Sequence, residues 1–213
     1  MKGKIALFLH QPKCSVQSGN GIMKALADHY NFKIFTKHTV EPDFFNDVDM
    51  IAIPGGIGDA SSFKKLFQEN GKRVEEFVNN GGRYLGICMG AYWAGKHYFD
   101  ILNRIDAVQY ITQPKADTRR PHAKAVKIEW FGKEEQMFFY DGCALVGHGP
   151  MDIVAKYAND DAMAIYQDRI GLIGCHPESE VHWYEAYNYM KPQWHEGRHH
   201  GLLLNFVDEL MKR

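Results

Sequence analysis

The sequence lacks most of the features that assign a protein to a class at once, and cysteine is the first of them. Only four cysteines occur among 213 residues, and no two stand in a Cys-x-x-Cys pair, which argues against a zinc ribbon or a dithiol redox site. A chain of this length buries a core without disulfides, so a reducing cytoplasm is the expected location. The four are Cys14, Cys88, Cys143 and Cys175.

A strong net charge and a long apolar run are also lacking. The 25 basic and 26 acidic residues leave a formal net charge of −1 at pH 7, which gives no electrostatic reason to expect a nucleic-acid or membrane partner. No apolar run approaches the roughly 20 residues that span a bilayer. The strand-like stretch Ile5–His10 is too short for the core of a signal peptide, and no small-residue cleavage site follows it.

The first half of the chain alternates between strand and helix patterns. Because the links between them are short, this alternation predicts a parallel sheet that is covered by helices on both faces. Apolar runs and periodicity place the elements. Strands are expected at Lys4–Leu9, Phe32–Phe35, Val48–Ile53 and Arg83–Ile87, and helices at Asn20–His29, from Ser61 to about Asn79, and directly after Cys88.

The second half has strand patterns without long helices between them, which predicts an antiparallel extension of the sheet. Its strands are expected at Arg104–Thr112, Ala123–Trp130, Gln136–Tyr140 and Asp152–Tyr157, followed by a hairpin of Ala162–Gln167 and Arg169–Cys175. Two helices close the chain, at Ser179–Met190 and His200–Met211. We therefore predict a single α/β domain over residues 1–213, with an open, mostly parallel sheet.

Cys88 has the surroundings of a nucleophile. It stands between an expected strand and an expected helix, with Gly86 and Gly90 two positions to either side, which is the spacing of a nucleophile elbow. Glycine lets neighbouring backbone pack closely where a Cβ would clash. A helix N-terminus also favours the thiolate form. By itself the pattern also fits a small buried cysteine at the end of a strand.

His176 and Glu178 follow the last expected strand and supply what a thiol nucleophile needs. A thiol requires a base, and the base requires an acceptor that orients it. Ligands of open parallel sheets bind at the carboxyl ends of the strands, so we expect both side chains to meet Cys88 there.

The loop Pro54-Gly55-Gly56 follows the third expected strand and reaches the same edge. Acyl transfer builds negative charge on the substrate oxygen, and backbone N–H groups aimed at that oxygen stabilise it. We expect the N–H of Gly56 or Gly55, together with that of Met89, to form an oxyanion hole. A plain turn is the simpler alternative for this loop.

These three segments, in this order, resemble the class I glutamine amidotransferase family, and the resemblance spans nearly the whole chain. It implies the flavodoxin-like α/β fold of that family. The stretch from Gly82 to Ala94 is closer still to the amidotransferase-like domain at the N-terminus of fungal-type biotin protein ligases. The stretches Val126–Trp130 and Phe139–Gly142 are also similar to that subgroup.

The resemblance implies a mechanism that uses no cofactor and no metal. The Cys88 thiolate attacks the side-chain amide of glutamine, and His176 protonates the departing ammonia and then activates water against the thioester. Glu178 holds His176. A separate synthetase protein would take up the ammonia. Gly90 and Tyr92 are expected to bind the substrate.

Two features leave alternatives open. Many glutamine-using members have Gln four residues after the nucleophile, where this chain has Tyr92. Another cysteine hydrolase or peptidase, or a non-catalytic regulatory domain as in biotin protein ligases, therefore remains possible on the same fold. The sequence from His195 to His199 also matches the zinc motif H-E-x-x-H. Gly197 within it and Pro192 before it disfavour the required helix, so we interpret this segment as a polar loop.

Overall fold

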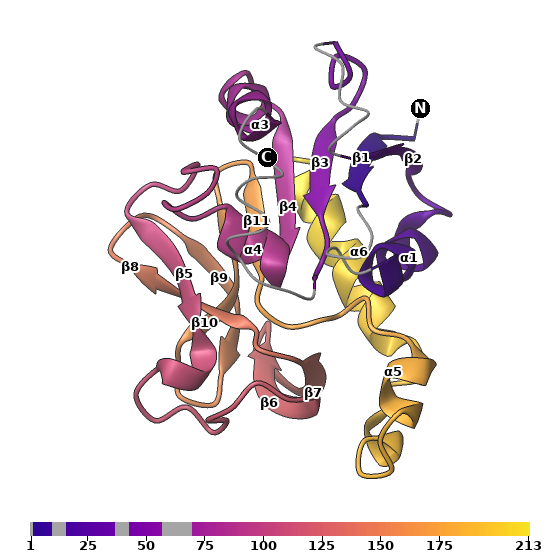
Figure 1. Ribbon diagram of the computed structural model, residues 1–213, viewed down its shortest axis with the longest axis vertical. Coiled ribbons are helices and arrows are strands. Elements are labelled where there is room, and N and C mark those ends of the chain that lie inside the picture. The colour runs from indigo at the N-terminus through magenta and orange to yellow at the C-terminus, as the bar shows by residue number, and fades with distance from the viewer. Residues whose placement is uncertain (1, 10–15, 37–42, 57–69) are drawn as a thin grey trace.

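The computed structural model describes residues 2–9, 16–36, 43–56 and 70–213 and contains one mixed sheet (Figure 1). The parallel strands are β1 (Lys4–Phe8), β2 (Asn31–Phe35), β3 (Met50–Ile53), β4 (Arg83–Ile87) and β11 (Ile170–Ile173). The antiparallel strands are β5 (Ile105–Gln109), β6 (Lys124–Trp130), β7 (Lys133–Phe139), β8 (Cys143–Gly147), β9 (Asp152–Tyr157) and β10 (Ala162–Gln167). Their order is β2-β1-β3-β4-β11-β10-β9-β6-β7, and β8 pairs with both β10 and β5.

Helices cover both faces of the parallel half, as the alternation in the sequence predicts. They are α1 (Val16–Leu26), α3 (Asn70–Asn79), α4 (Met89–Trp93) and α6 (Arg198–Leu210). Helix α5 (Val181–Glu185) packs against β7 instead, and the 3₁₀ turns are η1 (Tyr110–Thr112) and η2 (Lys191–Gln193). In Figure 1, α1 and α6 lie on one face, whereas α3 and α4 lie on the other. Among the described residues no helix is long and apolar enough to cross a membrane.

Successive side chains of β1 point to opposite faces of the sheet, so they pack in two separate hydrophobic cores. Ile5 and Leu7 pack in the cluster that includes α1 and α6, whereas Ala6 and Phe8 pack in the cluster that includes α3 and α4. All four side chains have no exposed surface. A strand that is buried on both faces consists of a continuous apolar run, and this run is why the sequence predicts β1.

The antiparallel extension confirms the prediction for the second half, with one strand that the sequence did not reveal. β9 and β10 have the predicted boundaries, and β10 forms the expected antiparallel hairpin with β11 around Asp168, whose φ is 49°. β8 was missed because its five residues are followed at once by turn-forming Gly-His-Gly-Pro.

The helix predicted for Ser179–Met190 is wrong in its length. Only Val181–Glu185 forms α-helix, and turns and η2 follow, with Pro192 at the start of that 3₁₀ turn. The predicted start at Ser61 lies outside the described residues, and within the range predicted for this helix the structure describes α3 (Asn70–Asn79).

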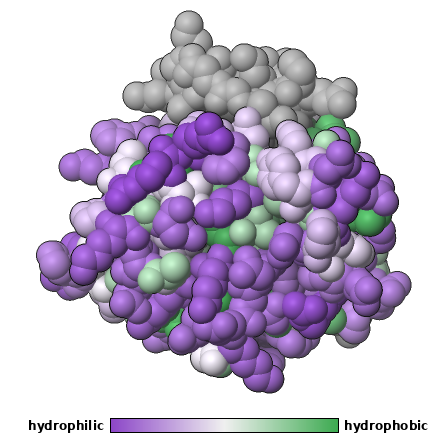
Figure 2. Space-filling view, turned by 90° about the horizontal axis from the view of Figure 1, so that it is seen from below, coloured by the Kyte–Doolittle hydropathy of each residue, from purple (hydrophilic) through white to green (hydrophobic). Residues whose placement is uncertain are grey.

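The order of the strands brings the segments that carry the candidate residues to one edge of the sheet. β3, β4 and β11 are parallel neighbours, with Ile53 paired to Gly86 and Ile173 paired to Ile87. The segments that follow these three strands therefore leave the sheet at one edge. Figure 2 views the molecule from below, where a largely hydrophilic surface surrounds a few apolar patches.

Candidate functional site

Cys88 occupies a sharp turn between β4 and α4. Its φ of 49° and ψ of −103° lie in a region that residues with a Cβ rarely adopt, and its N–H donates to Ile173 O over 2.8 Å. Close packing explains both flanking glycines. A Cβ at Gly86 would lie 2.4 Å from Gly90 O, and a Cβ at Gly90 would lie 2.1 Å from Ile53 O.

His176 and Glu178 form a buried pair directly after β11. Nδ1 of His176 lies 2.8 Å from Oε1 of Glu178, and the two residues are 5% and 0% exposed. The His176 N–H donates to Phe138 O over 2.9 Å. The rings of Phe138 and Trp183 stand edge-on to the imidazole, with centroid distances of 5.9 Å and 5.4 Å. The ring is thus held by the backbone, by a carboxylate and by two aromatic walls.

The other side of the imidazole meets Cys88, so the structure brings together the three residues singled out in the sequence. Burial lowers the pKa of His176, but the Glu178 carboxylate and a hydrogen-bonded contact with Cys88 outweigh it and raise that pKa from 6.5 to about 10. The Cys88 sulfur also lies 3.8 Å from Tyr140 O. The Cys88 sulfur therefore has a positively charged imidazolium as its neighbour.

Ser18 joins this site from α1 and was not anticipated. Its hydroxyl donates to Oε1 of Glu178 over 2.6 Å and accepts the N–H of Gly55 over 2.9 Å. Ser18 has no exposed surface, and Gly21, one turn further on, packs so tightly that a Cβ there would lie 2.1 Å from Glu178 O. A serine in a helix has no sequence signal of its own, but the Ser-x-x-Gly spacing on one face is a clue to close packing.

The Gly55 N–H is engaged by Ser18, which corrects one of the two alternatives for the oxyanion hole. Gly55 instead packs against the catalytic candidate, because a Cβ there would lie 2.6 Å from Cε1 of His176. Gly56 and Met89 remain the candidate donors. Met89 is the first residue of α4, where backbone N–H groups have no partner within the helix.

Gly90 and Tyr92, the expected substrate-binding residues, have structural contacts. Gly90 O accepts the hydroxyl of Tyr84 over 2.6 Å. The Tyr92 hydroxyl donates to Asp141 O over 3.2 Å, and burial raises its pKa. Tyr92 therefore ties the helix after the nucleophile to the loop after β7.

A cavity of about 330 Å³ opens beside the imidazole. Gly55, Gly56 and His176 line it, together with residues of α1, of β7 and the positions next to β6 and β7, of α5 and of the turn after α5. The other lining residues are Gln17, Ala123, Phe138, Tyr140, His182, Trp183, Ala186 and Tyr187. A cavity of this size next to the candidate base can hold a small-molecule substrate.

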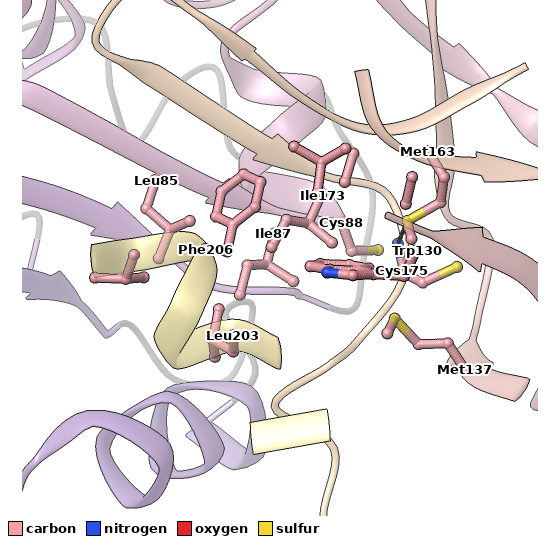
Figure 3. Close-up of a cluster of buried hydrophobic side chains, with 14 of the residues drawn as sticks. Leu85, Ile87, Cys88, Trp130, Met137, Met163, Ile173, Cys175, Leu203 and Phe206 are labelled. Atoms are coloured by element: carbon pink, nitrogen blue, oxygen red, sulfur yellow. Dashed lines mark hydrogen bonds between the residues drawn. The ribbon is translucent and has the colours of Figure 1, made fainter. Parts of the chain in front are cut away.

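The other described cysteines are core residues. Cys143 and Cys175 have no exposed surface, and burial raises the pKa of both thiols. Figure 3 shows Cys88 and Cys175 in one apolar cluster with Trp130. Cys14 lies outside the described residues.

The H-E-x-x-H segment is a buried histidine stack. His195 precedes α6, which begins after Gly197, so the two histidines do not share a helix as the zinc motif requires. The rings of His195 and His199 stack at 3.9 Å, and burial lowers their pKa values to about 3 and about 4. The segment does lead into α6 as a loop, as predicted, but its two histidines are nearly fully buried, which the interpretation as a polar loop did not anticipate. Within the described ranges no cluster of His, Cys, Asp and Glu could hold a metal ion.

Comparison with known protein families agrees with the resemblance in the sequence. Residues 11–106, slightly less than half of the chain, match the family described as "Biotin-protein ligase, N terminal". An uncharacterized protein of Chlamydia muridarum (strain MoPn / Nigg) is 36% identical over 58 residues, which are 27% of this chain. The aligned part covers only 22% of that protein.

Comparison with solved structures identifies the fold. A glutamine amidotransferase from Thermotoga maritima superposes over 100% of both chains with a TM-score of 0.72 and 12% identity. A glutamine amidotransferase from Methylobacillus flagellatus covers 90% of this chain and 76% of its own, with a TM-score of 0.56 and 14% identity. The mmIFT52 N-terminal domain covers 99% and 97%, with a TM-score of 0.54 and 10% identity. The fold is that of the class I glutamine amidotransferases, as predicted, and it does not by itself assign a reaction.

Gly55→Ala tests whether the packing of the glycine loop positions the imidazole. The new Cβ would displace a ring that aromatic walls hold in place, so we expect alkylation of Cys88 by iodoacetamide to slow about 10- to 100-fold. Gly201→Ala is the matched control, because a Cβ there meets nothing within 4 Å. An unchanged alkylation rate in folded Gly55→Ala protein would contradict this geometry.

The raised pKa of His176 predicts a pH dependence. Below pH 10 the imidazolium keeps its proton, so a positive charge lies beside the Cys88 sulfur, and this charge disappears as the pH rises through 10. At pH 7 we therefore expect His176→Asn to slow alkylation of Cys88 about tenfold or more, with the two rates converging above pH 10. Mass spectrometry would locate the label. Equal rates at pH 7 would show that the imidazolium does not act on the sulfur.

Proposed function

We propose that this protein is a cysteine amidohydrolase of the glutamine amidotransferase type, with Cys88, His176 and Glu178 as its catalytic triad. The observation that carries the proposal is the contact of one buried imidazole with both a thiol and a carboxylate. Its position at the carboxyl edge of a parallel sheet, beside a cavity, supports the same assignment.

Each residue has a chemical role in the proposed reaction. The Cys88 thiolate attacks the amide carbonyl carbon and forms a C–S bond, and the N–H groups of Gly56 and Met89 stabilise the oxyanion. The C–N bond breaks when His176 gives its proton to the leaving ammonia. His176 then removes a proton from water, which attacks the thioester, and the thiol is regenerated together with a carboxylate product. Glu178 holds Nδ1 of His176 throughout.

The side-chain amide of glutamine is the first substrate to test, with a separate synthetase as acceptor of the ammonia. A different amide or peptide bond is the second candidate. Tyr92 favours this second candidate, because its hydroxyl is engaged by Asp141 O at the position where many glutamine-using members have Gln.

Cys88→Ala tests the proposal. The wild-type protein is expected to release ammonia from glutamine or from a small amide, and Cys88→Ala is expected to lose this activity by more than about 1,000-fold, because no thioester can form. Cys175→Ala is the matched control, since its thiol is buried in the core. Trapping of a covalent intermediate on Cys88 by a chloroketone analogue of glutamine gives an independent readout. Ammonia release that survives in Cys88→Ala would rule out the proposed nucleophile.

A further inference from the structure

The cavity beside His176 has a wall of aromatic side chains. Phe138 and Trp183 contact each other with a centroid distance of 5.1 Å and both stand edge-on to the imidazole. Tyr140 and Tyr187 extend this wall, and two alanines leave room between the rings. Rings of this kind favour a planar or apolar group on the ligand.

This wall is a poor match for free glutamine. Its α-ammonium and α-carboxylate groups would have to leave water for an aromatic surface, which costs free energy unless each meets an opposite charge. None of the described residues that line the cavity is a lysine, arginine, aspartate or glutamate. The polar side-chain groups of the lining belong to Gln17, His176 and His182 and to the two tyrosines.

The indole group of Trp183 places a second requirement on the ligand, which is a hydrogen-bond acceptor. Its indole nitrogen is buried, and no acceptor among the described residues takes its N–H. A buried donor without a partner costs stability, so a ligand that shifts the indole toward the cavity and offers its N–H a carbonyl oxygen would gain from this hydrogen bond. Trp183 lines the cavity. The preferred ligand therefore combines an uncharged aromatic or aliphatic group with a carbonyl.

We infer that the substrate is a primary amide carried by a larger, locally uncharged molecule with an apolar group, such as an N-acylated or peptide-linked glutamine, rather than the free amino acid. This inference rests on the proposed function. Attack by Cys88 releases ammonia with the proton from His176, and water then converts the thioester to a carboxylate. The apolar part of the molecule occupies the aromatic wall and takes no part in the bond changes.

The test compares ammonia release from free glutamine and from N-benzyloxycarbonyl-glutamine methylamide. We expect kcat/KM to be at least about tenfold higher for the blocked compound. Trp183→Leu should remove most of that advantage, because it should lower kcat/KM for the blocked compound much more than kcat/KM for free glutamine. Val181→Ala is the matched control, because Val181 lies in the same helix α5 outside the cavity lining.

Three outcomes separate this inference from the proposed function. Preference for the blocked compound that Trp183→Leu abolishes supports the inference. Equal or better use of free glutamine, still dependent on Cys88, overturns it and keeps the proposed function. Absence of turnover with both compounds, with Cys88 unreactive to a chloroketone analogue of either, overturns both.

A second inference rests on different contacts, those of Ser18. One hydroxyl links Gly55 of the glycine loop to Oε1 of Glu178, the same oxygen that lies against Nδ1 of His176. The geometry points to Ser18 as a positioning residue that fixes the carboxylate and, through it, the imidazole. Ser18 is not itself among the residues that line the cavity, and it acts on the site through Gly55 and Glu178.

Ser18→Ala tests whether Ser18 positions Glu178 and His176 or only contributes to the stability of the fold. We expect kcat and the rate of Cys88 alkylation at pH 7 to fall about tenfold, with KM within twofold of the wild type, because one hydrogen bond to a charged group is lost. Ser18→Thr, which keeps the hydroxyl, should recover most of both rates. Asn20→Ala is the control, since Asn20 is an exposed position in α1. Alkylation of folded Ser18→Ala protein within twofold of the wild-type rate would overturn this role, whatever the substrate.

Discussion

The Glu178 carboxylate has no exposed surface, and an isolated charge in that position would cost several kcal/mol to hold away from water. Two groups offset this cost: the imidazole of His176 and the hydroxyl of Ser18 both lie on its Oε1. A buried anion of this kind keeps its neighbour protonated, which is why the pKa of His176 rises although burial opposes it. The reactivity proposed for Cys88 depends on this pairing.

The fold holds the pair in place through close backbone contacts. Three parallel strands bring the glycine loop, the nucleophile and the His-Glu segment to one edge, and α1 closes the site from the side. Glycine stands at the points where these segments touch, because a Cβ at Gly21 or Gly90 would lie 2.1 Å from a carbonyl oxygen. The histidine stack supports the His-Glu segment from behind, since Nε2 of His195 lies 3.4 Å from the Ser179 hydroxyl.

Much of this arrangement could be predicted from the sequence, and the physical reasons are specific. The fold was predicted correctly from the order of the strand and helix patterns, and the sequence also predicted that Cys88, His176 and Glu178 would lie at the same edge of the sheet. Ser18 could not be found in this way, because a helical serine is usually exposed and its partner lies 160 residues away. The sequence also could not predict that the Gly55 N–H points to Ser18, because the orientation of a single peptide plane in a loop leaves no pattern in the sequence. Helix α5 is shorter than predicted because its aromatic residues pack on Phe138 instead of continuing a periodic apolar face.

The most direct measurement is a nitrogen-15 NMR titration of the His176 side chain in the resting protein. The account predicts an imidazolium with both ring nitrogens protonated at pH 8, with a pKa near 10 that falls in Cys88→Ala protein, where the contact with the sulfur is lost. A neutral ring at pH 8 that titrates near 6.5 and does not respond to Cys88→Ala would contradict the central claim.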